Sequence, residues 1–214
     1  LVGRRDLGIA SLADLAGKRI GVAPHTNSEF MLSRMLREEA IPEDRVTRVP
    51  LKPEQMVDAL ARGEVDGIAT WMPHIADAQA RLPEDQTVTL RTPGYINQAL
   101  LGTQATTLDG RREALQRLLR ALVRAQDYLY AHPEEALHQL EAHLVFEQRE
   151  RMRQNWNDLK FQVRLDNVLL KTLENEGAWL AARASPQVSV PDYRAAFATE
   201  FLEAARPEAV TLEP

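Results

Sequence analysis

Residues 19–69 contain the alternation that decides the fold. Residues 19–22 read RIGV, and two further short apolar runs follow, VTRVPL at 46–51 and VDGIA at 65–69. Between these strand-like runs, apolar residues from Phe30 to Leu36 recur at helical spacing, and Pro53–Gly63 forms a second helical stretch. An order of strand, helix, strand, helix, strand with short connections predicts a parallel sheet covered by helices, which is the α/β class.

The pattern changes character along the rest of the chain. After a helix predicted at 74–81, residues 88–91 and 98–102 are predicted as further strands. A long amphipathic helix then runs from Asp109 to the His132-Pro133 pair. Helical stretches are also predicted at 134–144, 147–156, 168–182 and 193–205. The carboxyl-terminal half is therefore expected to be helical.

Composition excludes several classes of protein. Hydrophobic residues make up 44% and charged residues 27% of the 214-residue chain, and the net charge is −5, which does not suit a nucleic-acid-binding protein. No apolar run is long enough for a membrane span, and no signal segment opens the chain. Leu1 is not an initiator residue, which indicates a processed or trimmed end. The absence of cysteine excludes disulfides, thiolate metal sites and cysteine nucleophiles.

Two stretches resemble signature segments of class II solute-binding proteins. Residues 8–22 read GIASLADLAGKRIGV, and residues 59–73 read ALARGEVDGIATWMP. In the family that binds sulfonates, taurine, nitrate and thiamine precursors, the first segment enters the second lobe. The second segment carries a Gly-x-Val-Asp strand followed by Trp-x-Pro at the cleft. The long helix that ends at His132-Pro133 also resembles that family's helical region, so the resemblance covers nearly the whole chain.

The resemblance implies a periplasmic-binding-protein-like two-lobed fold with a central parallel or mixed sheet and a helical carboxyl-terminal region. It assigns residues 18–91 to lobe 2, and residues 1–17 and 92–214 to the remainder of lobe 1 with the carboxyl-terminal helices. Family members have further strands and helices ahead of the region that corresponds to Leu1–Gly8, so we expect the first part of lobe 1 to be missing here. An incomplete lobe leaves open pairing with another chain, including a homodimer.

The implied function is capture of a small organic anion, or of a nitrogen- or sulfur-containing nutrient, for the membrane subunits of an ABC importer. The expected location is periplasmic or otherwise extracytoplasmic, with no cofactor and no nucleic-acid partner. One alternative is the ligand-sensing domain of a membrane signalling protein with a fused or partner signalling module, because residues 206–212 (RPEAVTL) resemble the tail of such domains. Another is an enzyme of the same fold, but the resembling sulfinate desulfinases and pyrimidine synthases depend on cysteine.

The first candidate site lies between a strand end and a helix start. Thr26, Asn27 and Ser28 follow the strand at 19–22, and the free N–H groups of a helix N-terminus bind anions. Ligands of open α/β sheets bind outside the carboxyl ends of the strands, which is where these residues lie. The competing interpretation is that one of the three only caps its own helix.

Trp71 is the second candidate, since it follows the strand at 65–69 and offers a flat apolar wall with one N–H donor. Met72 stands where relatives often carry an acidic residue, which disfavours a zwitterionic ligand and favours a simple anion or a neutral ring.

Further candidates flank these two places. His25 and His74 can donate hydrogen bonds or make binding pH-dependent, although each also suits an exposed loop. Tyr95 and Asn97 lie where the chain is expected to cross between lobes, next to a Pro-Gly turn. His138 and His143 do not have zinc-ligand spacing, so no metal site is predicted.

Overall fold

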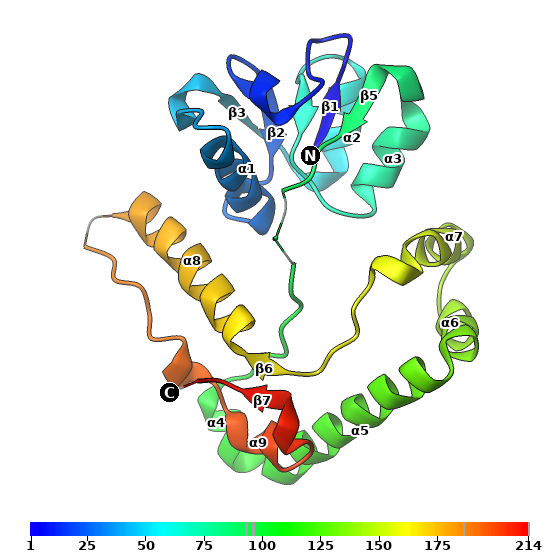
Figure 1. The fold of residues 1–214 in the computed structure, drawn as a ribbon, viewed down its shortest axis with the longest axis vertical. Helices are drawn as coiled ribbons and strands as arrows, with labels where there is room; N and C mark the ends of the chain where they lie inside the picture. The colour runs from blue at the N-terminus through cyan, green and yellow to red at the C-terminus, as the bar shows by residue number, and fades with distance from the viewer. Residues whose placement is uncertain (93, 96, 186, 214) are drawn as a thin grey trace. The chain divides into compact units, whose positions relative to one another are not determined.

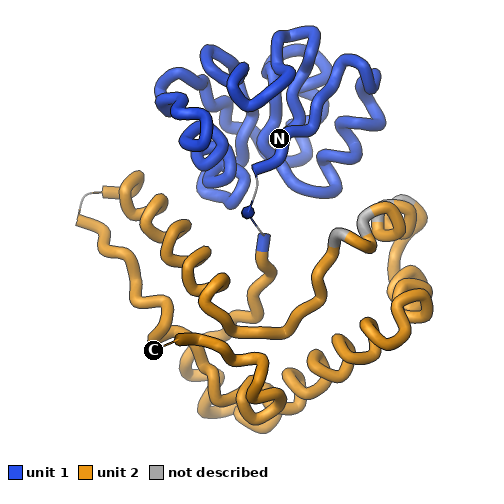
Figure 2. The backbone as a smooth tube through the Cα atoms, viewed as in Figure 1, with its two compact units in different colours: residues 1–97 blue, residues 98–214 orange. Residues whose placement is uncertain are grey.

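The computed structural model of this chain describes residues 1–92, 94–95, 97–185 and 187–213, with the backbone alone at 147, 151, 155 and 158. The chain forms two compact units, residues 1–97 and residues 98–214 (Figure 2). Each unit is described by itself below. No helix among the described residues has the length and apolar character needed to cross a lipid bilayer.

Unit 1 is built on a mixed five-stranded sheet (Figure 1). Its strands, in sheet order, are β3 (Thr47–Pro50), β2 (Arg19–Val22), β4 (Gly67–Ile68), β1 (Val2–Arg4) and β5 (Thr87–Thr89). β2 is parallel to both β3 and β4, as the alternation predicts, whereas β1 is antiparallel to β4 and β5. The α/β class and the mixed central sheet are confirmed.

Helices cover both faces of this sheet. α1 (Asn27–Glu38) buries Leu32, Met35 and Leu36 against Ile20 and Val22 of β2 in one core cluster. The second cluster, on the other face, joins α2 (Pro53–Ala61) and α3 (His74–Arg81) to the sheet through residues such as Met56, Leu60, Ile68 and Ala78. Both clusters consist of fully buried side chains, which is the main source of stability for a unit of this size.

Two features shape the contact between β2 and β4. Asp66 accepts hydrogen bonds from the Arg19 backbone N–H at 2.8 Å and from the Arg19 guanidinium at 2.6 Å. Gly21 lies in β2 between β3 and β4, where an added Cβ would stand 2.9 Å from the Leu51 side chain and 3.2 Å from that of Ile68. The close approach of Leu51 and Ile68 therefore favours glycine at position 21, and Asp66 satisfies the backbone N–H at the start of β2.

β1 is the main departure from the sequence-based description of unit 1. It pairs Val2 with Ile68 on one side and with Thr89 on the other, so residues 2–4 lie inside the sheet of unit 1. Three residues with a central glycine are too short for a recognisable period of two. The compact units thus have boundaries that differ from the predicted 1–17, 18–91 and 92–214, and the division into two lobes stays a prediction.

Unit 2 is mainly helical. Its helices are α4 (Ala105–Gly110), α5 (Arg112–Ala131), α6 (Pro133–Glu141), α7 (Phe146–Asn155), α8 (Asn167–Ala184) and α9 (Thr199–Glu203). A two-stranded parallel ladder joins β6 (Leu165–Asp166) to β7 (Val210–Thr211). The helix predicted at 193–205 is shorter than expected, since residues 194–196 form a separate 3₁₀ turn ahead of α9.

The strand predicted at 98–102 is not formed. These residues are outside any helix or ladder, and no backbone hydrogen bond joins residues 98–103 to another described residue. A strand requires a neighbour to receive its backbone hydrogen bonds, so a strand-like sequence alone cannot form one.

Candidate functional site

The N-terminus of α1 follows β2 by a short turn. Thr26 is the N-cap residue, but its side chain makes no capping hydrogen bond to the helix. Its hydroxyl instead donates to the Ala23 carbonyl at 2.7 Å and lies 2.9 Å from the Ser28 hydroxyl. The interpretation of Thr26 as a mere side-chain cap therefore does not hold in this structure.

Two donors at this helix start have no partner in the described part of the chain. The backbone N–H groups of Asn27 and Ser28 make no hydrogen bond to any described residue, whereas those of Glu29 and Phe30 bond to the Thr26 carbonyl. Ser28 is buried, with 2% of its surface exposed. Free N–H groups at the positive end of a helix dipole attract the negative atoms of a ligand.

The turn before α1 has an unusual backbone. His25 has a φ of +59°, a left-handed conformation that non-glycine residues adopt at some energetic cost. Its N–H donates to the Glu29 carboxylate at 2.8 Å, and Glu29 also lies 3.9 Å from the Arg48 guanidinium. The His25 side chain is exposed at the mouth of this turn.

Asn97 and Tyr95 lie against the same helix. The Asn27 side-chain amide donates to the Asn97 side-chain oxygen at 2.9 Å. The Tyr95 ring lies 5.9 Å from the Phe30 ring, and the Arg34 guanidinium lies 6.0 Å from the Tyr95 ring centroid. The structure therefore brings six predicted residues together at the start of α1: His25, Thr26, Asn27, Ser28, Tyr95 and Asn97.

Trp71 and His74 form a second group after β4. Their rings meet edge to face, with centroids 6.1 Å apart, and the peptide between Met72 and Pro73 is cis. Because Gly21 pairs with Ile68 in parallel β2 and β4, both groups leave the sheet at the same edge. Among the described residues, no hydrogen bond or ring contact joins the two groups directly.

Sequence reasoning missed two hydroxyls at this edge. Thr70 follows β4 and Thr92 follows β5, and their exposed fractions are 1% and 8%. Neither Oγ1 atom has a hydrogen-bond partner among the described residues. A buried hydroxyl without a partner costs folding free energy, so each is a candidate to meet a ligand atom. The available signal was a threonine two or three residues after the end of a strand.

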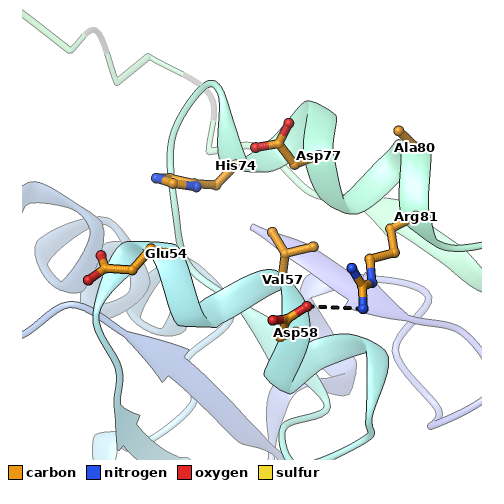
Figure 3. Close-up of a pocket in the computed structure, with 7 residues that line it drawn as sticks. All are labelled: Glu54, Val57, Asp58, His74, Asp77, Ala80 and Arg81. Carbon is orange, nitrogen blue, oxygen red and sulfur yellow. Dashed lines mark ion pairs between the residues drawn. The ribbon is translucent and has the colours of Figure 1, made fainter.

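A separate groove runs between α2 and α3 (Figure 3). It has a volume of about 570 Å³ and is lined by Glu54, Val57, Asp58, His74, Asp77, Ala80 and Arg81. An ion pair of 3.1 Å between Asp58 and Arg81 crosses it. Of the predicted site residues only His74 lines this groove, so the groove does not coincide with the N-terminus of α1.

Acidic and histidine side chains do not gather into a metal centre in the described part of the chain: no three of them lie close enough to hold an ion. The perturbed carboxylate nearest to β2 is Asp66. Burial raises its pKa, but the hydrogen bonds from the Arg19 guanidinium and backbone outweigh burial, so that the pKa is lower than usual. The lowered pKa of Asp66 therefore follows from the contact between β2 and β4.

The first 136 residues identify the family. The model described as NMT1/THI5 like matches residues 1–136, which is more than half of the chain and includes both groups of candidate residues. The chain belongs to the NMT1/THI5-like family. A Brucella abortus protein that is named as a binding protein is 25% identical over 134 residues. That match covers 61% of this chain and 42% of the relative, so the chain matches less than half of the relative's length.

Solved structures share the fold at low identity. The periplasmic aliphatic sulphonate binding protein SsuA of Escherichia coli has a TM-score of 0.69 at 17% identity, with 94% of this chain and 69% of that chain covered. The alkanesulfonate-binding protein SsuA of Xanthomonas axonopodis pv. citri, bound to MOPS, has a TM-score of 0.61 at 17% identity, with 99% and 68% covered. A mutant of DSZB in complex with biphenyl-2-sulfinic acid gives 0.63 at 19% identity, with 97% and 75% covered. The periplasmic-binding-protein-like fold is therefore shown.

Proposed function

We propose that this chain is part of an extracytoplasmic solute-binding protein that captures a small organic anion, or a nitrogen- or sulfur-containing nutrient, for an ABC importer. In this proposal Thr26, Asn27 and Ser28 hold the polar end of the solute, and Trp71 supplies an apolar wall. His25, His74, Tyr95 and Asn97 border the same site. Membership of the NMT1/THI5-like family supports the general role.

The observation that carries the proposal is the pair of N–H groups at the start of α1. The Asn27 and Ser28 backbone donors have no partner among the described residues, and the hydroxyls of Thr26 and Ser28 lie beside them. These donors carry no formal positive charge, yet they can bind an oxygen-rich group of a ligand. Neutral donors permit release of the ligand as well as capture. Matched solved proteins named as sulphonate-binding proteins support an oxyanion as one such group.

The local charges also limit the ligand. Glu29 places a carboxylate in the first turn of α1, where it accepts from His25 and lies near the positive charge of Arg48. Arg34 lies over the Tyr95 ring on the same helix. A singly charged anion with an apolar part suits this balance better than a multiply charged one, because Glu29 repels added negative charge.

Binding is better supported than catalysis. In the described part of the chain, no hydrogen bond joins His25 or His74 to the hydroxyls of Thr26 and Ser28. A hydroxyl nucleophile requires an adjacent base, and the chain contains no cysteine that could act in its place.

A thermal-shift screen of this chain tests the proposal. Sulfonates, nitrate, bicarbonate, carboxylates, amino acids and pyrimidines would each be added and the unfolding temperature measured. A ligand at 100 times its Kd stabilises the folded state by about 2.7 kcal/mol. For a chain of this size we expect a rise of roughly 5–10 °C.

Variants of α1 and of the β4 edge then locate the site. Ser28→Ala and Trp71→Ala are expected to abolish the shift. Ser33→Ala is the matched control, because Ser33 lies on the same helix, is also 2% exposed, and hydrogen-bonds within α1 to the Glu29 carbonyl at 3.2 Å. A shift that survives Ser28→Ala and Trp71→Ala would place the ligand elsewhere. A shift lost equally in Ser33→Ala would mean that general damage to α1 is the cause.

A further inference from the structure

Glu29 puts a negative charge beside the two free donors of α1. Its carboxylate accepts from the His25 N–H at 2.8 Å, and His25 lies ahead of the N-cap residue. The side chain therefore turns back toward the N-terminal end of the helix, where the N–H groups of Asn27 and Ser28 have no partner among the described residues. An anion held by those two N–H groups must lie close to the Glu29 carboxylate.

The charge of Glu29 lies largely out of the solvent. The side chains of Glu29 and Arg48 are 14% and 20% exposed. Partly buried charges are screened by water and salt less than exposed ones. A carboxylate in the first turn stabilises a helix, but it opposes the binding of an anion at the same end. Glu29 therefore affects the ligand as well as the helix.

Arg48 offsets only part of this charge. Its Nε atom lies 3.9 Å from the Glu29 carboxylate and has no hydrogen-bond partner among the described residues. The same guanidinium lies 3.0 Å from the Glu43 carboxylate. One positive charge is thus shared between two negative charges, so a repulsion from Glu29 remains at the start of α1.

A buried hydroxyl adds a neutral donor at the same edge of the sheet. In the parallel pair of β2 and β4, Gly21 pairs with Ile68. Continuing that register brings Thr70 level with Ala23, whose carbonyl accepts from the Thr26 hydroxyl. Thr70 is 1% exposed, and its Oγ1 atom has no partner among the described residues. Polar groups are thus available to an anion here without an added positive charge.

A doubly charged anion loses most from this arrangement. The cost of taking an ion out of water rises steeply with its charge, whereas its attraction to N–H donors rises only in proportion to that charge. Neutral donors beside a carboxylate return too little of this cost to a dianion. A singly charged anion has a smaller cost to recover, and the same donors suffice for it.

We propose that Glu29 is a specificity-determining residue that excludes doubly charged anions, and that Arg48 offsets its charge enough for a singly charged anion to bind. This inference rests on the proposed function, because it concerns the solute held at the start of α1. It assigns that solute to the monoanions and makes dianions of the same shape the rejected class.

Methanesulfonate and sulfate are the probes that test this selection. Both are tetrahedral and similar in size, and a methyl group of the first replaces a charged oxygen of the second. Each is titrated into the isotope-labelled 214-residue chain, and the Kd is read from the amide resonances of Asn27 and Ser28. The ionic strength is kept low and constant, because salt screens charges. In the parent chain, methanesulfonate is expected to bind more tightly than sulfate.

Glu29→Gln removes the charge and keeps an oxygen that can accept from His25. Loss of one charge a few ångströms from the ligand should raise the affinity about tenfold for a monoanion and about a hundredfold for a dianion. We therefore expect sulfate to gain about tenfold more than methanesulfonate. Glu38→Gln is the matched control, because Glu38 ends the same helix and pairs with Arg34 at 3.2 Å. It should leave the ratio of the two Kd values unchanged.

Arg48→Gln provides the second arm. Without its counter-charge Glu29 repels more strongly, so both anions should bind more weakly, and sulfate should lose by the larger factor. Replacing both Glu29 and Arg48 by Gln should return the ratio of the two Kd values toward that of the parent. The amide spectrum of each variant shows whether it is folded, and Glu29→Gln decides the question if Arg48→Gln is not.

Two results would overturn this selection alone. One is sulfate that binds the parent chain as tightly as methanesulfonate does. The other is an equal gain for both anions in Glu29→Gln, because a purely structural role in the His25 turn would affect them alike. A third result would overturn the proposed site at α1 as well: neither anion shifts the Asn27 and Ser28 amides, in the parent or in Glu29→Gln.

Discussion

In a chain whose first residue is Leu1, the buried amino group of that residue makes the stability of unit 1 depend on pH. Leu1 is 2% exposed, and burial, helped by the nearby charge of Arg91, lowers the pKa of its amino group from 8.0 to about 6. The unfolded chain therefore binds more protons between pH 6 and pH 8, so stability rises with pH across this window. The loss of stability caused by the buried amino group is complete below pH 6 and absent above pH 8.

The size of the effect follows from the pKa difference. Each pKa unit corresponds to about 1.4 kcal/mol, so a difference of two units gives about 2.7 kcal/mol. Most of this appears between pH 8.5 and pH 5.5, as a fall in the free energy of unfolding. The assay is urea denaturation of a chain whose first residue is Leu1. The fluorescence of Trp71 reports unfolding, and Trp156 and Trp179 are first replaced by Phe so that Trp71 is the remaining tryptophan.

The control is the same chain with a short Gly-Ser extension ahead of Leu1. Its amino group lies beyond the buried position, so the part of the pH dependence that is due to Leu1 should disappear. All side chains of residues 1–214 are the same in both chains, so their contributions cancel in the comparison. Identical pH profiles for the two chains would refute the assignment of this effect to Leu1.

Three further substitutions test the packing. Thr70→Val removes a buried hydroxyl that has no partner, and is expected to raise the free energy of unfolding of the ligand-free chain by about 1 kcal/mol in urea; a loss instead would show that the hydroxyl has a partner. Gly177→Ala places a methyl group against the Tyr193 ring and should cost about 1–3 kcal/mol, measured by thermal unfolding; an unchanged melting temperature would contradict this contact. Asp66→Asn removes the charged acceptor of Arg19 and should cost about 1–3 kcal/mol at pH 7. Because the folded-state pKa of Asp66 is lowered, the stability that its carboxylate contributes is present at neutral pH and is lost as pH falls through that pKa. A difference in free energy of unfolding between the parent and Asp66→Asn that stays constant down to pH 2 would refute the role assigned to the carboxylate.

The parallel core of unit 1 could be predicted because its signals are local. β2 covers the predicted residues 19–22, and α3 covers the predicted 74–81. Pro53 starts α2 as proline at a first helical position should, and Gly63, with a φ of +71°, follows its end. Each of these elements is specified by residues within one or two turns of itself.

Elements that depend on distant partners could not be predicted. β1 is recognisable only by its pairing with residues 67–68 and 87–89. The reverse error occurred at 98–102, where the strand-like sequence is present and the partner strand is not. At the candidate site, the place of Thr26–Ser28 followed from the strand–helix junction. The roles of Glu29 and Thr70 depend on hydrogen bonding and burial, which the local sequence does not reveal.

The position of β1 inside the sheet has a consequence for synthesis on the ribosome. β1 is the first strand of unit 1 to be made, and it lies between two strands that are made last in unit 1, β4 and β5. Until β5 has emerged, β1 has at most one neighbour, β4, and the sheet of unit 1 lacks an edge strand. Contacts between residues far apart in sequence form slowly and late. A nascent chain halted between β4 and β5 should therefore remain sensitive to proteases and dependent on chaperones, and resistance should appear in one step once β5 is free to pair.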